Sequence, residues 1–249
     1  MLVDDCLVLI VGLVAGSFFN VVAFRLLKGA SIVDPPSHCP HCKHPLAVFD
    51  LIPVLSYLVL CGKCRYCQHP IGLLYPVGEG LTALLFYLAY VKLGAQAELL
   101  VSWALASLIV LALLTDLKEK LILDKITIPF WGLLLGLRLF VGTEPWWWYW
   151  LGGLVGASLL WLVAWLSRGG IGGGDVKLYL AIGVALGPWL TVLSIGLASL
   201  AGAVVGGVLL LSGRVGRRQP IPFAPFIGVG AWTAYLYGAK LWDWYINLW

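Results

Sequence analysis

Residues 6–24 read CLVLIVGLVAGSFFNVVAF, an apolar stretch without a single charged residue. A helix needs about 20 mostly apolar residues to cross a bilayer, so this stretch predicts a membrane-spanning helix. Asp4 and Asp5 precede it, and Arg25 and Lys28 follow it. This order is the reverse of a secretory signal peptide, which has a basic start. We therefore expect a retained first span.

The rest of the chain has the same character. Its composition, 61% hydrophobic with a mean hydropathy of +0.96, lies far outside the range of soluble proteins. The predicted fold is an all-α polytopic membrane protein of about eight transmembrane helices. The further apolar stretches are 77–93, 98–115, 126–142, 147–166, 178–190, 191–211 and 223–240.

The basic residues predict the orientation. Lys and Arg collect in cytoplasmic loops, so the N-terminus is expected outside and the loop after residue 25 inside. With this topology thirteen of the sixteen basic residues lie on the cytoplasmic side. They are scattered over short loops, which fits contact with anionic membrane lipid and argues against a nucleic-acid partner.

One segment departs from membrane composition. Residues 29–74 hold all four histidines and five of the six cysteines. We predict a first transmembrane helix at 1–25, a cytoplasmic Cys-rich subdomain at 26–76 and a membrane helical domain at 77–249. A subdomain this small needs a metal or disulfides to stabilise it. No internal repeat of 20 to 50 residues is expected.

The cysteines of this segment form two CxxC pairs, Cys39 with Cys42 and Cys64 with Cys67. This spacing is typical of a structural zinc site with four thiolate ligands. A reduced cytoplasmic location favours zinc over disulfides. A redox dithiol and unliganded thiols stay open as alternatives. Cys61 overlaps the second pair as a substitute ligand, and the histidines are left out of the site.

Two aspartates stand at the ends of apolar stretches. Asp116 follows one such stretch, and Asp175 follows Gly172-Gly173-Gly174 at the start of another. Each alone is typical of a solvated or capping residue. The charge-derived topology, however, places both at the cytoplasmic face. Two carboxylates that share a proton can act as acid and base in peptide hydrolysis.

The glycines before Asp175 add to this hypothesis. Residues without a Cβ let a substrate strand approach the backbone, so we expect Gly172 and Gly174 to bind substrate. Glu79 and Asp124 are two further carboxylates, and either could be the second member of such a pair. Neither has a Gly-rich approach.

Several short motifs are specific when taken together. They are Gly16-Ser17-Phe18-Phe19-Asn20-Val21-Val22, Ser37-His38-Cys39-Pro40-His41-Cys42, Cys64-Arg65-Tyr66-Cys67, Tyr75-Pro76 with Glu79, Asp116-Leu117-Lys118, Gly172-Gly173-Gly174-Asp175-Val176-Lys177-Leu178 and Pro222-Phe223-Ala224-Pro225-Phe226. With them the chain resembles the type IV prepilin peptidase family, GxGD aspartic membrane proteases that also act as N-methyltransferases. Three positions depart from the family pattern: Cys61 for Arg, Leu123 for Pro and Ala224 for Gly.

The resemblance implies an activity. Asp116 and Asp175 would be the catalytic aspartates of an enzyme in the bacterial inner membrane. It would cut the basic leader of type IV prepilins or pseudopilins, the substrates of pilus and type II secretion systems, after a glycine at the cytoplasmic face. It would then methylate the new N-terminus with S-adenosylmethionine. Archaeal preflagellin peptidases lack the Cys segment and do not methylate, so the segment favours the bifunctional type.

Two other functions remain alternatives. A presenilin-like protease also carries GxGD, but it cuts inside a membrane-spanning substrate. A non-enzymatic scaffold or transporter would use its aspartates to carry protons or ions. The sequence has no GxGxxG unit for a methyl donor, so the position of the donor site is left open.

Overall fold

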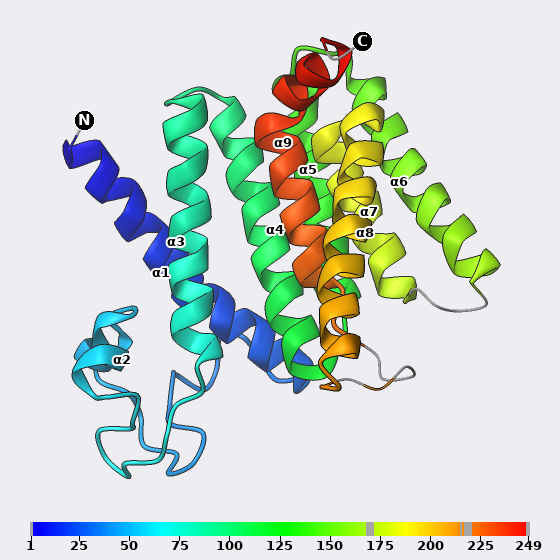
Figure 1. Ribbon diagram of the computed structural model, residues 1–249. Coiled ribbons are helices and arrows are strands. Elements are labelled where there is room, and N and C mark those ends of the chain that lie inside the picture. The colour runs from blue at the N-terminus through cyan, green and yellow to red at the C-terminus, as the bar shows by residue number, and fades with distance from the viewer. Residues whose placement is uncertain (1, 168–171, 215, 217–220, 248–249) are drawn as a thin grey trace. The chain divides into compact units, whose positions relative to one another are not determined.

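The computed structural model describes residues 2–167, 172–214, 216 and 221–247 (Figure 1). The predicted helical fold is confirmed, since the described residues contain no β-strand beyond two isolated bridges. The chain forms two compact units, residues 1–95 and 96–249. Each unit has its own helices and its own polar cluster.

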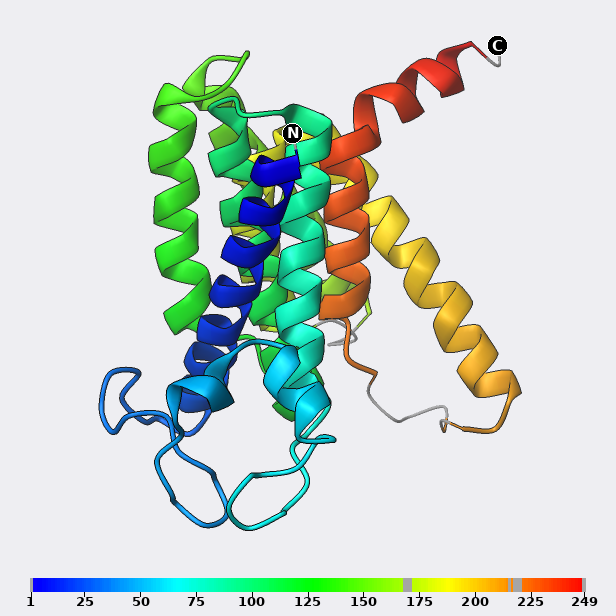
Figure 2. The same ribbon diagram turned by 90° about the vertical axis from the view of Figure 1, so that its left-hand side faces the viewer.

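Unit 1 is built on two packed helices, α1 (Leu2–Leu27) and α3 (Leu74–Leu93), with the Cys-rich segment at one end of them (Figure 2). The helices approach closely because α1 presents glycines. A Cβ at Gly12 would lie 2.5 Å from the Ala83 Cα, and one at Gly16 would lie 2.6 Å from the Glu79 Cα. Small residues four apart are a common device for packing membrane helices. The Cys-rich segment carries only the short helices η1 (Val48–Leu51) and α2 (Leu55–Val59).

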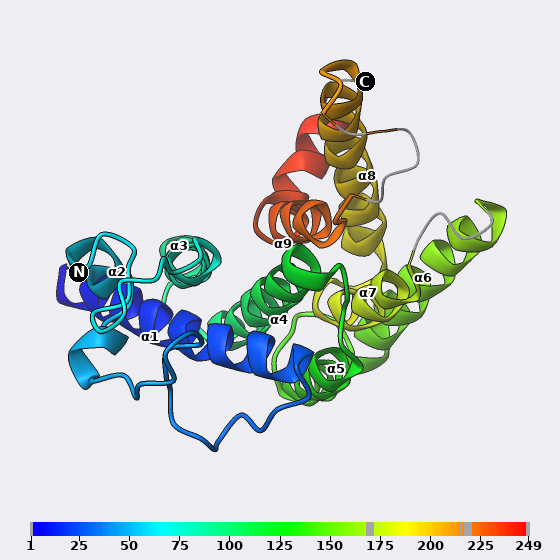
Figure 3. The same ribbon diagram turned by 90° about the horizontal axis from the view of Figure 1, so that it is seen from below.

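Unit 2 is a helical bundle in which α7 contacts each of the other helices described (Figure 3). Glycines again allow close approach: Gly152 and Gly183 face one another where α6 and α7 cross. The core of the unit is strongly apolar, and fifteen residues of α4 are buried. The helices are α4 (Glu98–Glu119), α5 (Asp124–Phe140), α6 (Trp146–Leu166), α7 (Gly173–Leu186), α8 (Pro188–Leu211) and α9 (Ala224–Ile246).

Every predicted apolar stretch overlaps a helix, although the ends differ. The largest difference is at 178–190, because α7 ends at Leu186 and α8 already begins at Pro188. Gly187 between them has φ +76, a left-handed conformation that glycine adopts readily and that ends α7. By length and composition, five described helices can cross a membrane: Val3–Leu27, Leu74–Leu93, Glu98–Glu119, Trp146–Leu166 and Pro188–Leu211.

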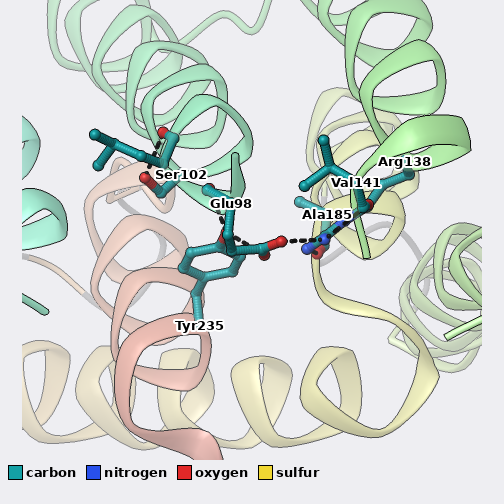
Figure 4. Close-up of polar contacts among 7 residues, drawn as sticks. Glu98, Ser102, Arg138, Val141, Ala185 and Tyr235 are labelled. Atoms are coloured by element: carbon teal, nitrogen blue, oxygen red, sulfur yellow. Dashed lines mark hydrogen bonds and ion pairs between the residues drawn. The ribbon is translucent and has the colours of Figure 1, made fainter. Parts of the chain in front are cut away.

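A partly buried ion pair fixes one end of unit 2 (Figure 4). The Arg138 guanidinium donates to Glu98 Oε2 at 2.9 Å and to the carbonyl oxygen of Ala185. The Tyr235 hydroxyl donates to Glu98 Oε1 at 2.6 Å, and the Tyr149 ring lies 4.3 Å from the guanidinium carbon. A charge inside a membrane bundle needs such partners. The cluster connects α4, α5, α6, α7 and α9 at the N-terminal end of α4.

Candidate active site and metal centre

Asp116 lies in the last turns of α4 and is only 7% exposed. Its Oδ2 accepts a hydrogen bond of 2.9 Å from the backbone N–H of Ala224, the first residue of α9. The first N–H groups of a helix have no partner within that helix and attract negative charge. The start of α9 therefore holds the Asp116 carboxylate in place.

Asp175 lies in the first turn of α7, before the apolar stretch that begins at residue 178 and outside the five candidate spans. Burial, and then the negative charge of Asp116, raise the pKa of Asp175 to about 6. The two carboxyl groups are thus close enough to interact. Unit 2 brings together the two aspartates that the sequence singled out.

The glycines before Asp175 have different surroundings. A Cβ at Gly174 would lie 2.9 Å from the Cβ of Ile122, so the loop after α4 passes too close for a side chain. A Cβ at Gly172 would lie 3.4 Å from a carboxylate oxygen of Asp175, whereas one at Gly173 would meet nothing within 4 Å. Gly172 is exposed beside the Asp175 carboxylate. Gly174 lets the loop pack against the start of α7.

The other two candidate carboxylates have partners elsewhere. Asp124 forms an exposed ion pair with Lys177, 2.7 Å long, which joins the first turns of α5 and α7. Glu79 belongs to unit 1, where its Oε2 accepts a hydrogen bond of 2.8 Å from the Val54 N–H. Asp116 and Asp175 therefore remain the pair to consider.

The four predicted zinc ligands come together in unit 1. The sulfur atoms of Cys39, Cys42, Cys64 and Cys67 all lie within 4.8 Å of one another, and those of Cys39 and Cys67 are 3.8 Å apart. Four sulfurs about 2.3 Å from a tetrahedral zinc ion would be about 3.8 Å apart, so the cluster fits a metal of that kind.

The backbone around the cluster also suits a metal thiolate. Burial raises the pKa of the Cys39 thiol, but the backbone N–H groups of Cys42 and His41 donate to its sulfur and bring that pKa down to about 7. Cys61 is exposed and does not belong to the cluster. The four-cysteine cluster can thus hold a metal ion without it.

The two CxxC pairs are a short internal repeat, which the sequence analysis missed. Each pair continues as Cys-x-x-Cys-x-His-Pro, 25 residues apart, in 39–45 and 64–70. In each copy the backbone N–H of the first cysteine donates to the carbonyl oxygen of the histidine. The residue before that cysteine forms an isolated β-bridge with the proline, and the residue after the second cysteine has a positive φ. The repeated Lys/Gln-His-Pro ending was the signal that could have revealed it.

Aromatic stacking between the two repeats follows the same symmetry. His41 of the first repeat stacks on His69 of the second, with ring centroids 4.2 Å apart. In the equivalent pair, Tyr66 of the second repeat stacks on His44 of the first at 3.6 Å. Three of the four histidines therefore join the two halves of the cysteine cluster, and none belongs to the group of possible metal ligands found among the described residues.

Two protein-family models match the chain, one in each unit. The bacterial peptidase A24 N-terminal domain matches residues 10–93, and the type IV leader peptidase family matches residues 103–207. The prepilin leader peptidase/N-methyltransferase of Bacillus subtilis is 38% identical over 239 residues, 96% of each chain. This chain belongs to the type IV leader peptidase family. The resemblance predicted from the sequence motifs is confirmed, and the chain is an enzyme of that family.

Relatives in other bacteria agree. The enzyme of the same name from Aeromonas hydrophila is 35% identical, with 97% of this chain and 93% of that protein aligned. The one from Pseudomonas aeruginosa is 34% identical, with 94% and 90% aligned. No solved structure matches the chain significantly. The family membership thus extends over both units.

The start of α9 is the part of the site that the sequence analysis did not interpret. The residues 222–226 were noted only for their resemblance, yet the Ala224 N–H is the partner of Asp116. The available signal was Pro225 at the start of an apolar stretch, since proline favours the first turn of a helix. That position implies free N–H groups at the same membrane face.

Proposed function

We propose that the chain cleaves the leader peptide of type IV prepilins or pseudopilins after a glycine, with Asp116 and Asp175 as the catalytic pair. The observation that carries this proposal is the proximity of the two carboxyl groups: burial raises the pKa of Asp175, and the negative charge of Asp116 raises it further. Family membership and the relatives' names support the substrate class.

The two aspartates have different roles in the proposed reaction. Asp175, with its raised pKa of about 6, carries the shared proton and donates it to the oxygen of the scissile carbonyl. Asp116 accepts a proton from water, because the Ala224 N–H stabilises its ionised form. The water oxygen attacks the carbonyl carbon and forms a gem-diol. Asp116 then passes its proton to the peptide nitrogen as the C–N bond breaks, and a gem-diol hydroxyl returns a proton to Asp175 as the carboxylic acid product forms. The glycines Gly172 and Gly174 are proposed to bind substrate near this pair.

The proposed location is the bacterial inner membrane, with the N-terminus outside and the aspartates at the cytoplasmic face. The basic residues support this orientation, because thirteen of sixteen then lie inside. The apolar segment of a prepilin would lie in the membrane, and its basic leader would reach the cytoplasmic loops. Cleavage would take place at the interface, in contact with membrane lipid.

We also propose that the enzyme methylates the new N-terminus, with S-adenosylmethionine as methyl donor. The names of the relatives and the Cys-rich segment support this second activity. Cys39, Cys42, Cys64 and Cys67 would hold a structural Zn²⁺, which fits their sulfur spacing. Zinc would stabilise a segment that has few apolar contacts of its own.

The direct test is to incubate the purified enzyme in lipid nanodiscs with a prepilin and S-adenosylmethionine and to measure the product masses. The expected result is loss of the leader followed by addition of one methyl group. Cleavage inside the apolar segment would instead indicate a presenilin-like protease. An intact substrate would favour a scaffold or transporter and would contradict the proposal.

A further inference from the structure

Unit 1 encloses a cavity that the proposed peptide cleavage does not use. Its volume is about 390 Å³, and its walls come from α1, α3 and the Cys-rich segment, including Cys39 and Cys64. Sites for small molecules and cofactors typically measure about 300–1,000 Å³. The cavity is thus large enough for a ligand, and it lies beside the metal cluster.

Asn20 is the first buried polar group in its wall. The side chain is 1% exposed, and its Nδ2 donates to the Tyr75 carbonyl oxygen at 2.8 Å. Its Oδ1 has no hydrogen-bond partner among the described residues. A buried acceptor without a donor is unfavourable, so a ligand with an N–H group would be favoured here.

Glu79 is the second, and it is 8% exposed. Its Oε2 accepts from the Val54 N–H, and the Ser17 hydroxyl lies within reach of the carboxylate. No cation of the described residues lies within ion-pair distance of it, whereas the other carboxylate in the wall, Asp50, is paired with Arg65 at 2.7 Å. A buried carboxylate of this kind favours a cationic ligand.

The packing of α1 on α3 brings these two groups to one place. Gly16 contacts the backbone of α3 at Glu79, and Asn20 lies one turn further along the same face of α1. The unpaired oxygen of Asn20 and the carboxylate of Glu79 therefore form one acceptor site in the cavity wall. It is apolar helix packing that buries both.

The cavity wall holds further charged and titratable groups. Arg25 is about 7.5 Å beyond Asn20 along α1 and donates to the Ser31 carbonyl oxygen. Tyr75 lies on α3, one turn before Glu79. The other groups, besides the two cysteines and the pair of Asp50 with Arg65, are Lys28, Lys43, His38, His69 and Tyr57. The cavity thus offers cations along one part and the two acceptors on another.

We propose that this cavity is the methyl-transfer site, and that Glu79 and Asn20 bind the α-amino group that leader cleavage exposes. An ammonium group has N–H donors for both oxygens and a charge that complements Glu79. The inference rests on the proposed methyl transfer and adds the residues that take its amine substrate.

The reaction balances with these groups. The ammonium first gives a proton to the Glu79 carboxylate. The lone pair of the neutral amine then forms a bond to the methyl carbon of S-adenosylmethionine, while the C–S bond breaks and its electrons stay on sulfur. The products are a methylammonium and S-adenosylhomocysteine, and Glu79 releases its proton to water.

Binding can be tested without the methyl donor. The probe is a peptide with the N-terminal sequence of a mature pilin, compared with the same peptide acetylated at its N-terminus. Wild-type enzyme should prefer the free amine. Glu79→Gln should weaken binding of the free amine at least about tenfold and leave the acetylated peptide unchanged. Glutamine keeps an acceptor for the Val54 N–H, so the variant should fold. Asn20→Leu should weaken the free amine less.

Turnover gives a second measurement on the same variants. Glu79→Gln should cleave prepilin within about twofold of wild type but methylate the product at least about tenfold more slowly near pH 7. Excess methyl donor should not restore the rate. The defect should shrink near pH 9, because a free α-amino group with a pKa of about 7.7–8.0 is then neutral without help. Asp34→Asn, an exposed carboxylate of unit 1, is the control.

The outcomes separate this inference from the function on which it rests. If wild-type enzyme neither cleaves nor methylates, the proposed function fails. If it does both and Glu79→Gln methylates normally, only the role of Glu79 is wrong. Full rescue by excess donor, or equal loss of affinity for the acetylated peptide, would also overturn the amine assignment.

Discussion

The metal centre and the aspartate pair assemble in different ways. In the metal centre, two copies of one short motif each supply two cysteines, and local hydrogen bonds shape each copy before the copies meet. In unit 2, Asp116 and Asp175 come from separate helices and meet only where α4, α7 and the start of α9 pack. Local geometry therefore determines the first site, and helix packing determines the second.

The largest expected effect is on the aspartate pair. Asp116→Asn or Asp175→Asn should lower the rate of leader cleavage at least about 100-fold, because each removes one partner of the acid–base pair. Zinc content should not change, since the two sites belong to different units. Cleavage is read from product masses and zinc by elemental analysis. Normal processing by either variant would refute the pair.

Removal of a cysteine should break the metal centre and leave the other site intact. Cys64→Ser should reduce bound zinc at least about tenfold, because a hydroxyl replaces a buried thiolate ligand. Cys61→Ser is the matched control, since Cys61 lies outside the cluster. Equal zinc loss in both variants would contradict the ligand set.

The packing at Gly174 should give a smaller effect. Gly174→Ala places a Cβ 2.9 Å from that of Ile122, so we expect a loss of about 1–3 kcal/mol in the stability of unit 2. Gly173→Ala, with nothing within 4 Å of its Cβ, should be nearly neutral. Thermal unfolding in nanodiscs compares the two. If Ile122→Gly, which removes the Cβ that the new methyl group would meet, does not rescue Gly174→Ala, the explanation is wrong.

The smallest effect should come from the stacked rings between the two repeats. His41→Ala removes the contact with His69 and should weaken the metal-bound segment by about 0.5 kcal/mol, because both rings are exposed. Bound zinc should stay, since the predicted ligands are the four cysteines. His38→Ala is the control, because His38 has no stacked partner among the described residues. Zinc release by a chelator, followed over time, measures the difference.

How far each site could be predicted from the sequence depends on whether local geometry or helix packing forms it. The four cysteines were predicted as a set because CxxC pairs have a spacing that a tetrahedral ion imposes. Both aspartates were predicted from charge-derived topology, which places span ends at one face but gives no distance between them. The Ala224 N–H and the cavity around Asn20 were not predicted. Both depend on which helices pack together, and the pattern of apolar residues does not encode that choice.

Local sequence patterns were enough to predict a helical membrane protein of the type IV leader peptidase family. Apolar stretches, basic loops and short motifs are local properties, and they suffice for that conclusion. Helix packing, by contrast, brings Asp116 and Asp175 close enough to interact and buries Asn20 and Glu79 in the wall of one cavity. These pairs are distant in the chain, and glycine contacts and helix crossings bring them together.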